Sequence, residues 1–366
     1  MAGVFYFCIM KDFLIVGLGL AGISFSETLR AHNKSFTVIS DQSFNSSVIA
    51  GGMYNPVVLK RYSEVWKAQE QLNAAMPLYT AIQKRLKVEF LNPMPVYRKF
   101  ASIEEQNNWF IAADKPKMAP FLSTKLIKIQ VPSIYAPYGY GEVLHSGYLD
   151  TKLLTEVYAA ELLSQANLQQ EHFDYNALQV QNDAVVYKGE SYKNIVFADG
   201  FGLHANPYFN NLPLDGTKGE LLIIKAPDLQ INFILKSSIF IMPIGNDLYK
   251  VGATYNWTDK TDAITEEGKQ ELLTELKQLI TCNFEVVHHF AGVRPTVRDR
   301  RPLVGQHYEH KNLFVLNGLG TRGVMFGPFL AQALYQFIYE GAELEKEINI
   351  NRIYKKLDIR IQHKNA

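Results

Sequence analysis

A glycine-rich turn stands directly after a short apolar segment near the N-terminus of this chain, and together they limit the possible folds. The segment Asp12–Val16 predicts a strand buried on both faces of a parallel sheet. It runs into Gly17-Leu18-Gly19-Leu20-Ala21-Gly22, which is followed by an amphipathic segment to about Ala31 and a second apolar run, Phe36–Ser40. Strand, turn, helix and strand fit within about thirty residues, the length of a βαβ unit. In this context the glycine pattern predicts a dinucleotide site.

Each glycine has a distinct expected role at that site. Gly17 permits the tight turn, Gly19 allows a pyrophosphate to approach the backbone, and Gly22 lets helix and strand pack closely. Leu20 and Ala21 open the helix, whose N-terminus offers N–H groups and a positive dipole end to the phosphates. An acidic residue is expected about 20 residues further on to hold the ribose. Ser40 and Asp41 occupy that place, and neither favours a 2′-phosphate.

Composition limits the class of protein. The chain has 366 residues, 47% hydrophobic and 20% charged, which predicts two packed globular units. Its formal net charge of +1 argues against general nucleic-acid binding. The two cysteines, Cys8 and Cys282, provide neither a disulfide framework nor a metal cluster, so we expect a cytoplasmic protein without a metal site.

The first ten residues, Met1–Met10, are apolar and aromatic but lack the charge order of a signal peptide. Met10 is an alternative native start. No segment reaches the ~20 apolar residues that span a bilayer, so we expect no membrane association.

The sequence alternates between segments with the pattern of parallel strands and segments with the pattern of antiparallel strands. Buried, parallel-type strands are expected at Asp12–Val16, Tyr192–Ala198 and Asn312–Leu316, whereas antiparallel patterns fill the stretches between them. We therefore predict an α/β, Rossmann-like nucleotide domain with a discontinuous α+β domain built on an antiparallel sheet. The expected boundaries are 10–90, 148–215 and 287–366 for the first domain, and 91–147 and 216–286 for the second.

Two later segments carry a resemblance to a known family. The stretch Ala291-Gly292-Val293-Arg294-Pro295-Thr296, followed by Asp299 and Arg301-Pro302-Leu303-Val304-Gly305, resembles the arginine–proline segment of the D-amino-acid oxidase and glycine oxidase family. The stretch Asn312-Leu313-Phe314-Val315-Leu316-Asn317-Gly318, with Gly320, Arg322, Gly323 and Pro328, resembles the family's last strand and the start of its flavin-contacting helix. The resemblance implies FAD, the cofactor of these amine-oxidising enzymes, and their two-domain fold. Covalent flavin attachment in sarcosine-oxidase relatives uses a cysteine after the arginine–proline segment, and none follows it here, so we expect noncovalent FAD.

The same resemblance implies further cofactor contacts. Ser46, Ser47, Gly51 and Gly52 are similar to the small-residue flavin loop, and Ala198 and Gly200 to a buried strand end beside the nucleotide. Asp199 between them departs from the small neutral residue that is usual there, as Ser40 departs from the usual glutamate. The turn before the last helix is expected to present N–H groups to the flavin through Gly320, Thr321, Arg322, Gly323 and Val324.

Three residues are implied as catalytic. Arg294 matches the arginine that binds the substrate carboxylate, for which a guanidinium offers two parallel hydrogen bonds. A structural ion pair with Asp299 is its alternative role. Arg322 is expected as a second anion contact or flavin neighbour, and Tyr255, after Val251-Gly252-Ala253-Thr254, as a pocket-lining residue. Tyr54 and Phe240 are weaker candidates, and His288-His289 is expected to be structural.

The expected reaction is oxidation of an amino acid or secondary amine, with hydride passing from the carbon bearing nitrogen to flavin N5 and the imine then hydrolysing. The segment from Gly51 to Asn55-Pro56 is also similar to the oxidase half of a bifunctional tRNA-uridine modification enzyme. A tRNA wobble-uridine oxidoreductase, with the loose cluster Lys60, Arg61, Lys67 and Arg98 as its RNA contact, is therefore an alternative. A flavin-binding protein without amine oxidase activity is a third. The sequence leaves the substrate, the electron acceptor and the oligomeric state open.

Overall fold

The computed structural model describes residues 10–41 and 46–359. The leader preceding Met10, and with it the question of the native start, lies outside the described residues. The chain divides into two compact units, one made of residues 1–48, 155–216 and 294–366 and the other of residues 49–154 and 217–293. Among the described helices, none is both long and apolar enough to cross a membrane.

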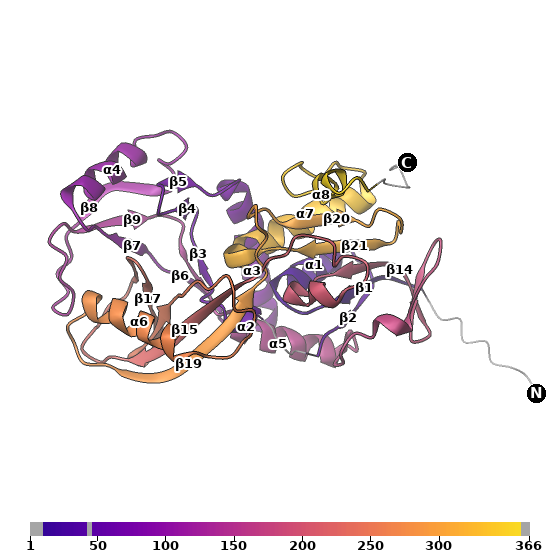
Figure 1. The fold of residues 1–366 in the computed structure, drawn as a ribbon, viewed down its shortest axis with the longest axis horizontal. Coiled ribbons are helices and arrows are strands. Elements are labelled where there is room, and N and C mark those ends of the chain that lie inside the picture. Colours follow the sequence, from indigo (N-terminus) through magenta and orange to yellow (C-terminus); the bar gives the residue numbers. More distant parts are fainter. Residues whose placement is uncertain (1–9, 42–45, 360–366) are drawn as a thin grey trace, which may run out of the picture. The chain divides into compact units, whose positions relative to one another are not determined.

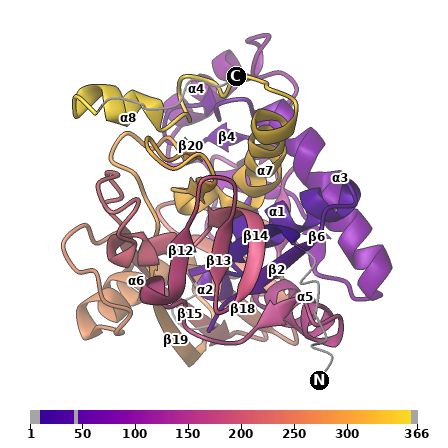
Figure 2. The ribbon, with the colours of Figure 1, turned by 90° about the vertical axis from the view of Figure 1, so that its right-hand side faces the viewer.

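The first unit is built on an eight-stranded sheet whose centre is parallel. β1 pairs with β2 on one side and β14 on the other, β11 continues beyond β2, and β21 lies parallel to β14. Figure 2 shows β12, β13 and β14 side by side as an antiparallel extension. The strands are β1 (Lys11–Val16), β2 (Phe36–Ile39), β11 (Leu168–Gln169), β12 (Leu178–Val180), β13 (Val185–Tyr187), β14 (Glu190–Phe197), β20 (Leu303–Gln306) and β21 (Leu313–Asn317).

Helices α1 (Leu20–Ala31) and α7 (Gly323–Tyr339) pack against each other in this unit (Figure 1). Its other helical segments are η1 (Tyr175–Ala177), η2 (Gly200–Ala205), η3 (Gly320–Arg322) and α8 (Asn351–Lys356). Helices α2 (Ser46–Ile49) and α5 (Thr151–Ser164) carry the chain from one unit into the other. Asp150, which the sequence predicts as the N-cap of this helix, caps α5 with its Oδ1 accepting the Leu153 N–H at 3.0 Å.

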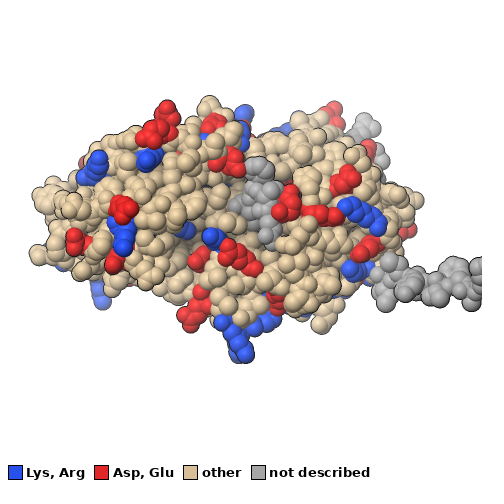
Figure 3. Space-filling view, turned by 90° about the horizontal axis from the view of Figure 1, so that it is seen from below, with Lys and Arg blue, Asp and Glu red and all other residues tan. Residues whose placement is uncertain are grey.

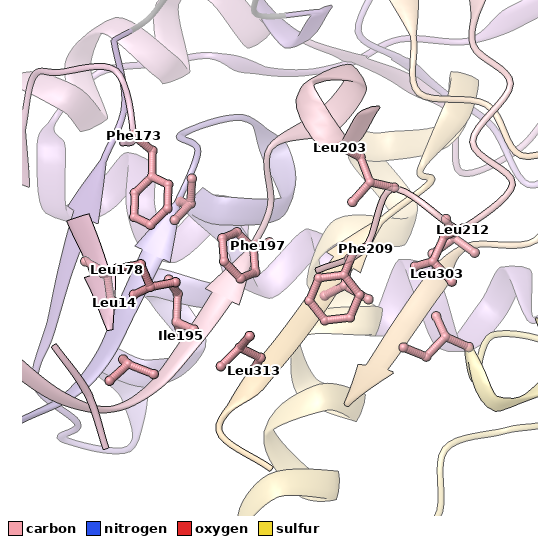
Figure 4. Packing of buried hydrophobic residues seen from close by; sticks show 14 of the residues in the cluster. Leu14, Phe173, Leu178, Ile195, Phe197, Leu203, Phe209, Leu212, Leu303 and Leu313 are labelled. Carbon is pink, nitrogen blue, oxygen red and sulfur yellow. The ribbon is translucent and has the colours of Figure 1, made fainter. Parts of the chain in front are cut away.

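The four central strands of this sheet are apolar because both faces are covered. Leu14, Ile195, Phe197 and Leu313 are fully buried, and Figure 4 shows them packed with side chains from the η2 region. Continuous burial of this kind is what distinguishes a parallel, two-sided sheet from an amphipathic one. The predicted α/β fold class is confirmed.

The second unit is built on an antiparallel-rich eight-stranded sheet with the order β19-β15-β18-β17-β16-β7-β9-β8. These strands are β7 (Val96–Lys99), β8 (Leu122–Ile127), β9 (Tyr140–Val143), β15 (Thr217–Lys225), β16 (Ile234–Lys236), β17 (Phe240–Gly245), β18 (Leu248–Gly252) and β19 (Glu285–Arg294). Smaller sheets contain β3 (Met53–Tyr54), β6 (Leu91–Pro93) and β10 (Gly147–Leu149), and β4 (Val57–Val58) and β5 (Ser63–Glu64). The helices are α3 (Ala68–Leu86), α4 (Ile103–Ala113) and α6 (Glu266–Leu279).

The division differs from the expected boundaries at one long segment. Residues 49–90, which the sequence analysis assigned to the nucleotide domain, lie in the second unit. The reason is strand pairing, since β10 lies between β3 and β6 in one antiparallel sheet. Strand β19 also belongs to the second unit except for its last residue, Arg294.

Two helix boundaries also differ from expectation. The near-helical spacing of apolar residues from Trp66 to Leu86 predicts a helix over about residues 63–87, but α3 begins at Ala68 because Ser63 and Glu64 pair with Val57 and Val58 as β5. Pro328, expected in the first turn of the last helix, lies inside α7, which begins at Gly323 because the Gly320–Arg322 turn runs directly into it. The residues Gly245-Asn246-Asp247 predict a turn between two antiparallel strands, and the structure confirms it, with positive φ at all three residues.

Candidate active site

The glycine turn after β1 has the geometry that the sequence predicted. Gly17 has φ +102°, and a Cβ there would lie 2.5 Å from the Ala198 carbonyl oxygen. A Cβ on Gly22 would lie 2.0 Å from the Gly17 carbonyl oxygen. Gly19 is the N-cap of α1 with extended backbone and no side-chain cap. Both close approaches exclude any larger residue, so this turn fits a dinucleotide held against bare backbone.

Two further contacts fix the start of α1 in the same unit. The Leu20 N–H donates to Ser47 Oγ at 3.1 Å, which places the predicted loop residues Ser46 and Ser47 at the N-terminus of the helix. Ala21, in the first turn, is buried. The helix end that is expected to face the phosphates is therefore bordered by the predicted flavin loop.

At the tip of β2, the two candidates for the ribose contact differ in their surroundings. The Ser40 N–H donates to the Gln169 carbonyl at 3.1 Å. Asp41 Oδ2 lies 2.9 Å from Nδ1 of His172, an exposed side chain on the loop after β11. Asp41 is thus the carboxylate present at this edge, but which of the two residues holds the ribose stays a prediction.

The tip of β14 carries a polar cluster that sequence reasoning did not anticipate. Asp199 follows Ala198, and its Cα would lie 3.2 Å from a Cβ on Gly17. Its carboxylate accepts hydrogen bonds from Asn317 Nδ2 at 2.9 Å, Asn206 Nδ2 at 3.3 Å and the Tyr175 hydroxyl at 3.4 Å. Burial raises the pKa of Asp199 to about 6 despite these three donors.

Asn317 links this cluster to the turn before α7. Its Nδ2 also donates to the Gly200 carbonyl at 2.9 Å, and its Oδ1 accepts the Gly318 N–H at 2.7 Å. Gly200 and Gly318 both have positive φ. The ends of β14 and β21 are therefore joined side by side next to the glycine turn.

The turn before α7 is tied to the arginine–proline segment. The Gly320 N–H donates to the Pro295 carbonyl at 3.0 Å, and Gly320 has φ +55°. The buried Thr296 hydroxyl has no hydrogen-bond partner, and it lies 3.7 Å from the position of a Cβ on Gly320. A buried hydroxyl without a partner is costly, so it fits a site completed by a bound polar group.

Four predicted flavin-contacting residues come directly after Gly320 in the sequence. Thr321 is exposed, Arg322 and Gly323 are half-buried, and Val324 is buried as α7 begins. A Cβ on Gly323 would lie 3.0 Å from Leu20 Cδ1, so α7 and α1 approach closely at their N-terminal ends. Two helix N-termini thus converge on the same edge of the sheet, an arrangement suited to an anionic cofactor.

Arg294 ends β19 and stands two residues before Thr296. Along the same strand, the rings of His288 and Phe290 lie with centroids 5.8 Å apart, because residues i and i+2 of a strand point to the same face. His289 points the other way, with Nε2 2.7 Å from a Glu220 carboxylate oxygen. This contact supports the structural interpretation of His289, whereas the role of Arg294 stays a prediction.

The remaining predicted site residues lie in the second unit. Tyr255 is 58% exposed beyond the end of β18. A Cβ on Gly51 would lie 2.9 Å from the Phe240 ring, and Gly52, with φ +72°, has no room for one beside the Leu149 carbonyl. Burial raises the pKa of Tyr54 to about 12. Their contribution to flavin or substrate binding stays a prediction.

One group in the described part of the chain has donor atoms close enough for a metal ion. The ligand atoms of His307, Glu309 and His310 lie within 4.8 Å of one another. However, His307 Nδ1 accepts the backbone N–H groups of both Glu309 and His310, at 3.1 and 3.2 Å. A neutral ring that accepts at Nδ1 carries its proton on Nε2 and has no lone pair left for a metal. We therefore assign no metal to this group.

Charged side chains offer little support for a general nucleic-acid interface. Acidic and basic groups are interspersed on the face shown in Figure 3. Of the basic residues proposed for RNA, Arg98 is bound to Glu105 at 2.7 Å. Among the described residues, Figure 3 shows no broad basic surface on that face.

Comparison with known proteins identifies the family. Residues 12–336 match the model of the FAD dependent oxidoreductase family. The chain is 24% identical over 229 residues to glycine oxidase from Bacillus subtilis, covering 58% of this chain and 60% of that protein. It is 28% identical over 182 residues to the tRNA 5-methylaminomethyl-2-thiouridine biosynthesis bifunctional protein from Shewanella sediminis, covering 39% of this chain and 25% of that protein. The matches thus span about three fifths of the glycine oxidase and about a quarter of the tRNA biosynthesis protein.

Solved structures share the fold. Glycine oxidase from Geobacillus kaustophilus superposes with a TM-score of 0.74 at 18% identity, covering 98% of this chain and 100% of that chain. L-proline dehydrogenase from P. horikoshii gives a TM-score of 0.78 at 14% identity, covering 95% and 98%. The family match spans most of the sequence and includes the glycine turn, the arginine–proline segment and the start of α7. The chain therefore belongs to the FAD-dependent oxidoreductase family and is an enzyme whose cofactor is FAD.

Proposed function

We propose that this enzyme oxidises an amino acid or a secondary amine that carries a carboxylate. The bound flavin supplies the chemistry, by accepting at N5 a hydride from the carbon that bears the nitrogen. The resulting imine hydrolyses in water to a carbonyl compound and a released amine. The polypeptide has to hold the cofactor, orient the amine and bind the carboxylate.

One observation carries the proposal: the hydrogen bond from the Gly320 N–H to the Pro295 carbonyl at 3.0 Å. It joins the turn predicted to contact the flavin to the segment that contains Arg294. The residue predicted to bind the substrate is therefore adjacent in sequence to a residue bonded to the cofactor turn. That arrangement supports a carboxylate-bearing substrate held beside the flavin.

The roles of individual residues follow from their chemistry. We assign to Arg294 the binding of the substrate carboxylate, with which a guanidinium forms two parallel hydrogen bonds. Arg322, half-buried at the start of α7, is assigned a second anion contact or the flavin. Tyr255 is assigned to the pocket wall. The Thr296 hydroxyl and the α7 N–H groups are assigned to holding the flavin, and the positive end of the α7 dipole would attract negative charge on it.

Product analysis tests this function. Purified enzyme is incubated in air with glycine, sarcosine, D-amino acids and L-proline, and the carbonyl product and released amine are quantified. We expect one of these compounds to give both products in equal amounts, except for cyclic amines, whose imine remains in the ring. Consumption of an amine without a carbonyl or imine product would contradict the proposed reaction.

A second candidate is the oxidation of a modified uridine in tRNA, favoured by the similarity to the Shewanella sediminis protein. Substrates for that reaction would also place a carbon next to an amine nitrogen. The test replaces small amines with tRNA isolated from cells lacking this enzyme, followed by nucleoside mass spectrometry. A mass change in one uridine derivative, with no turnover of small amines, would favour this candidate.

A further inference from the structure

The sheet of the second unit packs one apolar face against α6 and carries several cationic side chains on its other face. Residues on the apolar face pack with α6 in one cluster, which includes Leu235, Ile241, Val251, Leu272 and Leu276. Successive strand residues point to opposite faces. The neighbours of these strand residues, Lys236, Phe240 and Lys250, therefore lie on the face opposite α6.

Strand register places three of these side chains in one row. Lys236 is the antiparallel partner of Phe240 in β17 and the parallel partner of Arg98 in β7. Tyr97, the neighbour of Arg98, stacks against Phe233 of the apolar cluster, so Arg98 also lies on the opposite face. Phe240, Lys236 and Arg98 thus stand side by side across three strands.

The row contains two cationic side chains, Arg98 and Lys236, and of the two only Arg98 has a carboxylate partner among the described residues. Arg98 donates to Glu105 Oε1 from Nε at 2.9 Å and from Nη2 at 2.7 Å, and from Nη1 to the Ser237 carbonyl. The same Glu105 oxygen accepts the Tyr62 hydroxyl at 2.9 Å. Glu105 is thus fully engaged with Arg98 and Tyr62.

Lys236 makes one polar contact, from Nζ to the Ser238 carbonyl at 3.2 Å, and within the described chain it has no carboxylate within 4.0 Å. It is half-buried, and burial together with the charge of Arg98 lowers its pKa to about 8. A desolvated ammonium without a counter-ion is unfavourable and is relieved by binding an anion.

A second lysine, Lys250, lies on the same face, and unlike Lys236 it is under the influence of a nearby carboxylate, that of Asp150. Lys250 Nζ contacts the Ala50 carbonyl at 3.3 Å and, among described residues, has no carboxylate within 4.0 Å. Ala50 precedes Gly51, which abuts the Phe240 ring. The unpaired cations therefore lie beside the segment that the sequence assigns to flavin contact.

We propose that Lys236, between Arg98 and Phe240, binds an anionic group of the substrate, a carboxylate or a phosphate, separate from the amine that is oxidised. This inference rests on the proposed function, because it assigns a second binding point to the same substrate. Its chemical consequence is that the natural substrate is a dianion or a phosphate-bearing amine. Simple amino acids such as sarcosine fill only one of the two anion sites.

The test is protection of Lys236 from acetylation in the FAD-loaded enzyme. A water-soluble acetyl ester is added at pH 8, and the labelling rate of each lysine is measured by peptide mass spectrometry. The probes are inorganic phosphate, malonate and a tRNA anticodon stem-loop, each compared with sodium chloride at equal ionic strength. Lys225, exposed at the end of β15, is the internal control.

We expect phosphate or malonate to slow labelling of Lys236 about fivefold at about four times its Kd, because the unoccupied fraction sets the rate. Labelling of Lys225 stays unchanged. Protection by malonate but not phosphate identifies a carboxylate site, and protection by phosphate or by the stem-loop identifies a phosphate site. Equal labelling of Lys236 with every probe, or equal protection by chloride, would overturn the proposal.

Variants of Lys236 distinguish a failure of the second anion site from a failure of the proposed function. Lys236→Arg keeps the charge, and Lys236→Met removes it, with Lys225→Met as the matched control. For a dianionic amine such as iminodiacetate we expect Lys236→Met to raise KM about tenfold with kcat little changed, since a charged hydrogen bond contributes about 1.5 kcal/mol. The KM for sarcosine stays the same. An unchanged KM for iminodiacetate contradicts the second anion site, whereas loss of all amine turnover in the unmodified enzyme contradicts the proposed function itself.

Discussion

The Gly320 N–H donates to the Pro295 carbonyl at 3.0 Å, which ties the turn before α7 to the end of β19. This hydrogen bond connects the turn that is predicted to contact the flavin with the segment that contains Arg294. Family membership and FAD dependence rest on the family match over residues 12–336. The substrate and the roles of single residues are proposals that the following experiments test.

Replacing Arg294 tests carboxylate binding. Arg294→Lys keeps the charge but loses the paired geometry, so we expect the substrate Kd to rise about 10- to 100-fold, corresponding to about 1.5–3 kcal/mol. The flavin spectrum stays the same. Anaerobic titration monitored by flavin absorbance measures the Kd. The matched control is Arg298→Lys, because Arg298 is highly exposed. Equal Kd values in all three proteins would exclude Arg294 from the binding site.

A substitution in the glycine turn tests the position of the cofactor. Gly22→Ala puts a Cβ 2.0 Å from the Gly17 carbonyl oxygen, so the turn has to move. We expect the variant to purify largely without FAD and to bind added FAD at least about tenfold more weakly. Gly202→Ala is the control, since its Cβ meets an ordinary contact of 3.7 Å. Tight FAD binding by Gly22→Ala, measured by fluorescence quenching, would show that the cofactor does not depend on this turn.

The Thr296 hydroxyl gives a test that separates folding from binding. It is buried without a partner, so Thr296→Val removes an unsatisfied group and leaves the Tm of the FAD-free protein unchanged or raised. If the hydroxyl contacts FAD, the same change weakens FAD binding about five- to tenfold, corresponding to about 1–1.4 kcal/mol. Thr296→Ser restores affinity. Unaltered FAD affinity in the valine variant would assign the hydroxyl no cofactor role.

The pKa of Asp199 predicts a pH dependence. Burial raises this pKa from 3.8 to about 6, so the contribution of the carboxyl to folding is greatest below pH 4 and is lost as pH rises to 6. Above pH 6 the group is charged, and it lies beside the turn expected to hold the pyrophosphate. We expect FAD affinity to fall about fivefold between pH 5 and 7, a repulsion on the order of 1 kcal/mol.

Asp199→Asn removes the titrating group and flattens this profile, whereas Asp41→Asn leaves it in place. FAD affinity across the pH range is measured by calorimetry in a constant-ionic-strength buffer. A slope that persists in Asp199→Asn would assign the pH dependence to a different residue.

Local sequence patterns were sufficient for tight turns and helix caps. The glycine turn, the cap at Asp150 and the turn at Gly245–Asp247 are set by neighbouring residues, so each was predictable without the rest of the chain. The placement of residues 49–90 was not, because β3 is positioned by its pairing with β10, almost a hundred residues away in sequence. A strand of two residues gives no periodic signal for such a partner.

The same limit explains which site residues were missed. Asp199 was noted only as a departure from the family pattern, and its contacts with Asn317, Asn206 and Tyr175 come from three distant segments. Lys236 is a single charged residue at the end of a short strand. Its position beside Arg98 depends on a parallel pairing between strands more than a hundred residues apart. Strand parity alone would have placed it on the face opposite Leu235, but not next to a second cation.

The visible spectrum of the purified enzyme, recorded anaerobically before and after addition of glycine, sarcosine, iminodiacetate, D-amino acids and L-proline, shows whether a small amine reduces the flavin. We expect twin flavin bands that one of these carboxylate-bearing amines bleaches, because the flavin would accept the hydride from the carbon next to nitrogen. Flavin bands that persist with every amine in the panel would contradict small-amine oxidation. A colourless protein that does not take up FAD would contradict the assignment of the cofactor site.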